Sequence, residues 1–155
     1  MGKYFKMSRR FDKRNPSDFG LMACSGEAYA INPEDGSIWN SCALYDFGWG
    51  CENGFYRVPL PDFSELLEIV LESHEQEDVF GAAAIILDLF PDELLEELER
   101  IYSCLGRNTT KIKLAKVFQL DLGINRSHIQ GKNYSEIVAD ASRWHAIAEA
   151  VSGLK

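Results

Sequence analysis

Histidine and cysteine are the side chains that most often bind metals or act as nucleophiles in proteins. Here no histidine lies four residues from another histidine or from a cysteine, and no two cysteines form a C-x-x-C pair. The residues in question are His74, His128, His145, Cys24, Cys42, Cys51 and Cys104. This spacing predicts no metal site, no cofactor and no disulfide framework, and it favours cysteines that are small buried thiols. Cys104 is the clearest such thiol, on the apolar side of a predicted helix.

Cys51 lies in a glycine-rich stretch, residues 48–54, where a thiol on a loop could act as a nucleophile. That role would require a base from a distant part of the chain. A metal site that joins Cys42, Cys51 and one histidine is a second alternative. The glycines form neither G-x-G-x-x-G nor G-K-[ST], so they do not indicate a phosphate site. The sequence therefore predicts no catalytic residue, and an enzyme without a local motif stays open as an alternative.

Acidic residues are concentrated in the middle of the chain, which has a net charge of −8. Residues 1–14 hold six basic residues and one acid, residues 15–99 one and nineteen, and residues 100–155 nine and four. Such a central block attracts basic partners and repels nucleic acid and anionic membranes. In the predicted first helix, glutamates at spacings of three and four share one face. We predict that a basic protein partner contacts Glu65, Glu68, Glu72 and Glu75; the alternative is a solvated face.

Six aromatic residues lie within residues 39–56, around the glycine-rich stretch. They are Trp39, Tyr45, Phe47, Trp49, Phe55 and Tyr56. Aromatic side chains on loops are favoured at interfaces, since they bury a large area at a small cost in conformational entropy. We predict that Trp39, Phe47 and Trp49 contact the partner. The alternative is that these rings fill a core between a sheet and helices.

The basic last third of the chain raises the question of nucleic-acid binding. Lys111, Lys113 and Lys116 lie on or near one predicted helix, and residues 114–129 are similar to a helix-turn-helix. However, Gly123 follows Ala115 by eight residues instead of the usual four. The negative net charge also opposes DNA binding. The sequence therefore predicts that nucleic acid is not the partner.

The hydrophobic pattern changes from strand-like to helix-like between Pro59 and Asp62. Residues 19–58 read as short strands with a turn at residues 32–36 and an irregular loop at residues 45–54. Residues 62–152 read as about five helices. The first begins at Asp62 with a stripe that runs to Leu71, three more are expected at residues 78–90, 91–105 and 110–122, and the last begins near Asn133 or Ser135 and ends before Gly153. The predicted fold is α+β, with a small N-terminal antiparallel β-meander packed on a C-terminal helix bundle. Residues 1–18 are expected to form a basic N-terminal arm, and residues 19–155 a single domain.

No apolar run approaches the roughly 20 residues that a membrane-spanning helix needs. The longest runs from Val79 to Leu87, and residues 1–14 do not resemble a secretory signal. We expect a cytoplasmic protein without a membrane partner, and the sequence leaves its oligomeric state open.

A family resemblance begins where the predicted strands end, at Pro61-Asp62-Phe63-Ser64-Glu65-Leu66-Leu67-Glu68. This phrase after a short meander is similar to the way bacterial SUKH-type immunity domains end. The resemblance covers about a third of the chain, and four more helical segments follow than that pattern has. It implies a small acidic cytoplasmic protein that masks a basic toxin such as a nuclease, and it carries over no functional residue. The alternative class is a helical adaptor or scaffold subunit of a protein complex.

Overall fold

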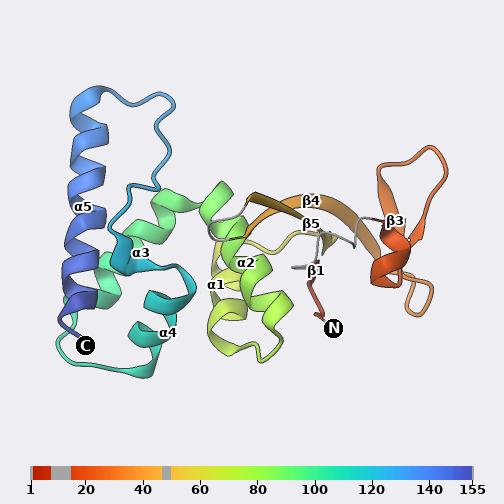
Figure 1. Ribbon diagram of the computed structural model, residues 1–155, viewed down its shortest axis with the longest axis horizontal. Helices are drawn as coiled ribbons and strands as arrows, with labels where there is room; N and C mark the ends of the chain where they lie inside the picture. Colours follow the sequence, from red (N-terminus) through yellow and green to blue (C-terminus); the bar gives the residue numbers. More distant parts are fainter. Residues whose placement is uncertain (1, 8–14, 47–49, 155) are drawn as a thin grey trace. The chain divides into compact units, whose positions relative to one another are not determined.

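The computed structural model describes residues 2–7, 15–46 and 50–154, with the backbone only at residues 43–46 and 50–53 (Figure 1). The chain forms two compact units, Met1–Ala84 (unit 1) and Ile85–Lys155 (unit 2). Within these described ranges, five strands in the N-terminal part and five α-helices after them confirm the predicted α+β class. A single domain over residues 19–155 stays a prediction.

The sheet of unit 1 is antiparallel, with the strand order β1-β5-β4-β3-β2. Its strands are β1 (Phe5–Met7), β2 (Met22–Ala23), β3 (Tyr29–Ile31), β4 (Ile38–Asp46) and β5 (Gly50–Arg57). Strands β2 to β5 follow one another as the predicted meander, after a short 3₁₀ helix, η1 (Pro16–Phe19). Strand β1 adds at the outer edge of β5, with Phe5 opposite Tyr56.

Strand β1 corrects the prediction that strands begin at residue 19 and that residues 1–18 form an arm. The pairing with β5 supplies backbone hydrogen bonds along one edge of this strand, and Phe5 is fully buried. A strand of three residues is too short to show an alternating pattern, so its existence depends on a partner some 50 residues away.

The predicted irregular loop at residues 45–54 is also corrected. Of its described residues, 45–46 belong to β4 and 50–54 to β5, with Tyr45 opposite Cys51 and Asp46 opposite Gly50; residues 47–49 lie outside the described part. Glycine weakens a strand by about 1 kcal/mol but does not forbid extended backbone. Here the continuous ladder between the two strands outweighs that local preference.

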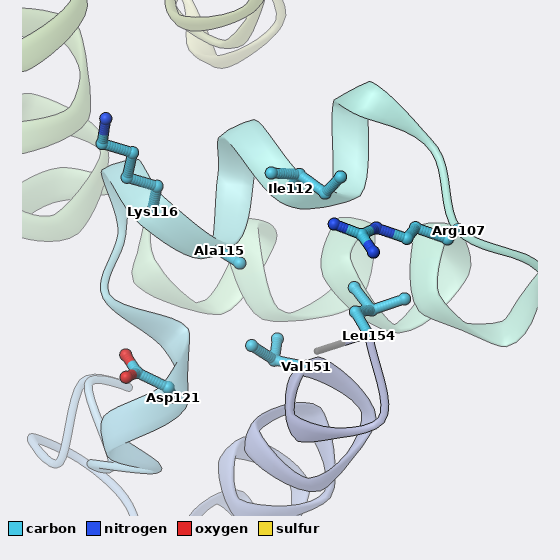
Figure 2. A pocket seen from close by; sticks show the side chains of 7 residues that line it. All are labelled: Arg107, Ile112, Ala115, Lys116, Asp121, Val151 and Leu154. Atoms are coloured by element: carbon cyan, nitrogen blue, oxygen red, sulfur yellow. The ribbon is translucent and has the colours of Figure 1, made fainter.

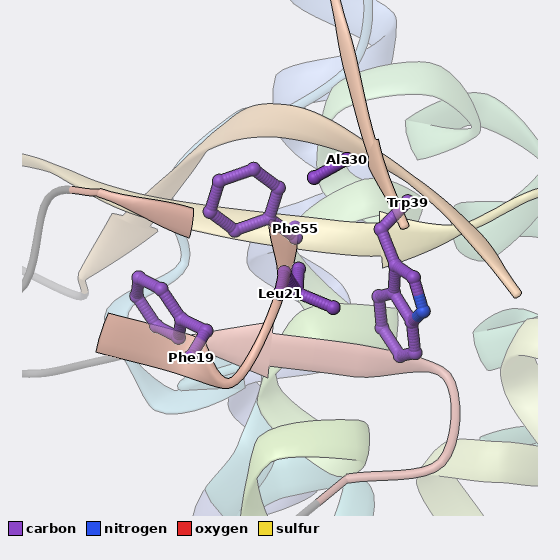
Figure 3. Packing of buried hydrophobic residues seen from close by; sticks show 5 residues of the cluster. All are labelled: Phe19, Leu21, Ala30, Trp39 and Phe55. Carbon is purple, nitrogen blue, oxygen red and sulfur yellow. The ribbon is translucent and has the colours of Figure 1, made fainter. Parts of the chain in front are cut away.

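The core of unit 1 on the sheet is a cluster of five buried side chains (Figure 3). They are Phe19, Leu21, Ala30, Trp39 and Phe55. The rings of Phe19 and Phe55 meet edge to face, with centroids 5.4 Å apart. Ala30 on β3 is the direct pairing partner of Trp39 on the neighbouring strand β4. The indole Nε1 of Trp39 donates a hydrogen bond to Ser37 Oγ at 2.8 Å.

The five helices agree with the predicted ones to within a few residues at most ends. They are α1 (Phe63–Glu72), α2 (Gln76–Leu89), α3 (Pro91–Ser103), α4 (Thr109–Val117) and α5 (Tyr134–Ser152). The predicted cap of α1 is confirmed, since Asp62 accepts from the Glu65 N–H and Glu65 accepts from the Asp62 N–H. In unit 2, buried Trp144 on α5 donates to Ser127 Oγ at 2.9 Å.

Helix α4 ends at Val117, earlier than the predicted end at residue 122. Gln119 adopts a left-handed backbone with φ of 49°, and a short 3₁₀ helix, η2 (Leu120–Leu122), follows. The left-handed conformation turns the chain out of the helix, although the apolar spacing continues through Leu122.

Replacing Gln119 with glycine is expected to stabilise the protein by about 0.5–1 kcal/mol. A non-glycine residue in this conformation costs about 1–2 kcal/mol, which exceeds the entropy that glycine adds to the unfolded chain. Urea denaturation measures the difference. The matched control is Gln130→Gly, because Gln130 is exposed and has an ordinary φ. A Gln119→Gly variant that is less stable than wild type would contradict the strain.

Candidate partner-binding site

A pocket of about 450 Å³ lies in unit 1 along one face of α1. It is lined by Lys3, Tyr4, Pro61, Glu65, Glu68, Ile69, Glu72, Ser73, Glu75 and Asp78. All four glutamates that the sequence predicts as partner contacts therefore line one pocket, which we call the acidic pocket. Helical spacing brings the first three onto one face, and the chain after α1 adds Glu75.

Two carboxylates next to these glutamates, Glu77 and Asp78, bind backbone N–H groups of this chain and so stabilise its fold. Asp78, near the start of α2, is 2% exposed and accepts hydrogen bonds from the backbone N–H groups of Lys3, Tyr4 and Phe5 at 2.8–2.9 Å. Glu77 accepts from the N–H of Gly2 at 2.9 Å. Both therefore hold the first residues of the chain against α2.

The acids of α3 are mostly engaged within unit 2. They form ion pairs in which Asp92 contacts Lys132, Glu97 contacts Arg100, and Glu99 contacts Arg143. The hydrogen bond from Arg143 holds the pKa of Glu99 below its usual value. The sequence-predicted acidic block at residues 62–99 is thus divided between internal pairs and the acidic pocket.

Glu68 and Glu72 differ from these acids, because neither stabilises a described part of the fold through a hydrogen bond or an ion pair. Both side chains are exposed, and neither forms a hydrogen bond or an ion pair with any residue that the structure describes. Like charges one helical turn apart repel each other, so this arrangement costs stability unless a cation approaches. The two glutamates are the strongest candidates for contacts with a basic partner.

None of the three aromatic residues predicted as partner contacts is found on a described surface of the structure. Trp39 is 2% exposed in the core of the sheet, so it is corrected from a partner contact to a core residue. Its burial follows from its place on the inward face of β4 beside Ala30. Phe47 and Trp49 lie outside the described residues. Tyr4 is the aromatic residue of the acidic pocket that sequence reasoning missed, and the Lys3 ammonium lies 5.2 Å from its ring centroid.

No local signal could have identified Lys3 and Tyr4. They reach the acidic pocket because Asp78, more than 70 residues later, binds their backbone N–H groups. Their types and spacing carry no motif, and the β1 segment is too short to predict.

The basic residues of α4 do not form one continuous surface. Lys111 is buried and donates to the carbonyl groups of Cys104 and Gly106, next to the end of α3. A cation is favoured there by the partial negative charge of the helix C-terminus. Lys111 therefore stabilises the connection between α3 and α4. It is not available to nucleic acid, unlike what the sequence suggested for Lys111, Lys113 and Lys116 together.

The cysteines also differ from expectation. Cys24 and Cys42 are half-buried, and Cys104 is exposed because α3 ends at Ser103, one residue before it. Burial raises the pKa of the Cys42 thiol to about 12, so it is not a ready nucleophile. The side chain of Cys51 lies outside the described residues.

Among the residues with described positions, no group of three or more histidine, cysteine or acidic side chains is arranged to hold a metal ion. None of the helices in the described ranges has the length and apolar character required to cross a bilayer.

Comparisons of this chain with known proteins give no match that could suggest its function. No protein-family model, no curated protein and no solved structure matches it. The resemblance of residues 61–68 to SUKH-type immunity domains stays a prediction, and the geometry of the acidic pocket carries the functional inference.

Proposed function

We propose that this chain is a non-catalytic protein that binds a basic segment of a protein partner in the acidic pocket of unit 1. The observation that supports this most is the convergence of Glu65, Glu68, Glu72 and Glu75 on one pocket. Among them, Glu68 and Glu72 have no counter-ion in the described structure.

The lining of the acidic pocket suits a lysine or arginine side chain. Such a side chain has an apolar stem and a cationic head. Pro61 and Ile69 offer apolar surface to the stem, and the glutamates offer acceptors to the head. The ring of Tyr4 already has the ammonium of Lys3 over it, 5.2 Å from its centroid, so the glutamates are the main acceptors for a partner's cation.

In the immunity-type form of this proposal, the partner is a basic toxin such as a nuclease, and the complex masks its cationic surface. A field of negative charge raises the association rate and selects against anionic partners. The net charge of −8 and the unpaired glutamates of α1 support this form.

An adaptor or scaffold role is the second candidate. Unit 2 exposes several large apolar side chains before and along α5, among them Ile129 at 64% and Tyr134 at 82%. Exposed apolar groups of this kind are typical of protein interfaces. In this role, association would depend little on salt.

Reversing the charge of Glu68 and Glu72 is expected to abolish most binding to a basic probe. The probe is an arginine- and lysine-rich decapeptide at 50 mM salt, and its affinity is measured by surface plasmon resonance. The Glu68→Lys/Glu72→Lys variant should associate at least tenfold more slowly and show a smaller salt dependence, since exposed charges mainly govern association rates.

The matched control for this experiment is Glu93→Lys/Glu96→Lys on α3, which changes the net charge equally. Both residues are exposed, and neither forms an ion pair with a described residue. Equal losses in the two variants would mean that net charge alone governs binding, and the proposed site would be wrong. Circular dichroism confirms that both variants are folded.

The natural partner can be identified by affinity capture from the native cell at low salt, followed by mass spectrometry. A basic protein that elutes with salt supports the proposal. An acidic or neutral protein that stays bound at high salt would favour the adaptor role.

A further inference from the structure

A second pocket, of about 260 Å³, lies in unit 2 between α4 and the end of α5 (Figure 2). It is lined by Arg107, Ile112, Ala115, Lys116, Asp121, Val151 and Leu154. Ile112 and Ala115 of α4 face Val151 and Leu154 across it, so the walls are apolar (Figure 2). The guanidinium of Arg107 extends between Ile112 and Leu154, while Lys116 and Asp121 lie toward the other end (Figure 2). We call this the amphipathic pocket.

The two cations of the amphipathic pocket differ from the other basic residues of unit 2. Arg107 and Lys116 form no hydrogen bond or ion pair with any residue in the described part of the chain. The remaining basic residues whose positions are described in unit 2 are all engaged. Carboxylates pair with Arg100, Lys132 and Arg143. Backbone carbonyl groups accept hydrogen bonds from Lys111 and Arg126, and Lys113 makes another contact.

This contrast indicates an anionic ligand. Both side chains are exposed, so water hydrates them and leaving them unpaired costs little. They are nevertheless the cations of unit 2, among its described residues, that remain available to an anion in this pocket. Arginine binds a carboxylate through two parallel hydrogen bonds. Asp121 at the far end would repel a second anionic group, so a ligand with one negative charge fits best.

The volume limits the size of the ligand. A water molecule occupies about 30 Å³ of liquid, so the amphipathic pocket holds the equivalent of roughly nine non-hydrogen atoms. That space accommodates a carboxylate with a short aliphatic chain, and it is too small for a nucleotide or a drug-sized molecule.

We propose that the amphipathic pocket binds a small aliphatic carboxylate, with Arg107 holding the carboxylate and the walls of α4 and α5 covering the chain. The ligand can come from a short free fatty acid or from the C-terminus of a peptide that ends in an aliphatic residue. This site is separate from the acidic pocket and does not depend on the function proposed for it.

The test titrates the full chain with hexanoate and with hexan-1-ol, the neutral molecule of the same chain length, by calorimetry and NMR. We expect hexanoate to bind with a dissociation constant on the order of 1 mM, given the limited affinity per atom of small ligands. Hexan-1-ol should bind about tenfold more weakly. Arg107→Gln should weaken hexanoate about tenfold, whereas Arg100→Gln, an equal loss of charge outside the pocket, should leave it unchanged.

A second variant tests the walls. Ala115→Leu adds a side chain inside the amphipathic pocket and should abolish hexanoate binding while the melting temperature changes little. Acetyl-glycyl-leucine, compared with its C-terminal amide, distinguishes the two sources: tighter binding of the free acid than of hexanoate identifies a peptide terminus, and weaker binding identifies a fatty acid. The proposal is overturned if hexanoate does not bind at 20 mM, if hexan-1-ol binds equally well, or if Arg107→Gln binds as wild type.

Discussion

Replacing Gly81 with alanine is expected to destabilise the protein by roughly 2 kcal/mol, although alanine is the better helix former. A Cβ atom at position 81 would lie 2.3 Å from Cγ of Phe5 and 2.5 Å from its Cβ. Overpacking of a core costs about 1–3 kcal/mol and more when backbone must move, whereas the gain in helix propensity is about 1 kcal/mol. The clash wins because Phe5 is fully buried against α2 and has no free space to enter.

Guanidinium denaturation of single and double variants isolates this contact. In a Phe5→Ala background the obstruction is gone, so Gly81→Ala should become neutral or stabilising by up to about 1 kcal/mol. The same loss of stability in both backgrounds would show that Phe5 is not the cause.

Replacing Asp78 with alanine is expected to have the largest effect on stability, a loss of about 3–5 kcal/mol. One nearly buried carboxylate accepts the N–H groups of Lys3, Tyr4 and Phe5. Without it, donors at the buried start of β1 lose their acceptor, and an unsatisfied buried group costs about 1–3 kcal/mol. The β1 strand should then detach, which would also remove Lys3 and Tyr4 from the acidic pocket.

Hydrogen exchange measures this detachment directly, because the amides of residues 3–7 should exchange much faster in Asp78→Ala. Asp78→Asn, which keeps one acceptor oxygen, should fall between wild type and Asp78→Ala. The control is Asp88→Ala, an exposed acid of the same helix, with a change within about 0.5 kcal/mol. A change of less than 1 kcal/mol in Asp78→Ala would contradict the role assigned to the carboxylate.

Local signals account for much of what the sequence predicts correctly. The cap formed by Asp62 and Glu65 and the proline at the start of α3 lie within four residues of the backbone groups they affect. The same short range brings Glu65, Glu68 and Glu72 onto one face of α1. The meander from β2 to β5 also follows from neighbouring segments joined by short turns.

Other features depend on residues that are far apart in the sequence. Asp78 and the first strand are more than 70 residues apart, and so their pairing leaves no periodic pattern. Tryptophan is a residue type that is common at interfaces, and only the position of Trp39 on the inward face of the sheet makes it a core residue. From the sequence, Lys111 is expected to be part of a basic surface. In the structure its ammonium instead donates to carbonyl groups just after the end of α3.

The sequence by itself therefore determined the α+β class, the helices and the shared glutamate face, because periodicity and capping act within a few residues. The tertiary structure alone decided which charges are available to a ligand. It pairs the acids of α3 with Lys132 and Arg143, leaves Glu68 and Glu72 without a counter-ion in the described structure, and places Arg107 over an apolar pocket. An ionic contact is set by distance in space, and residue spacing along the chain does not encode that distance.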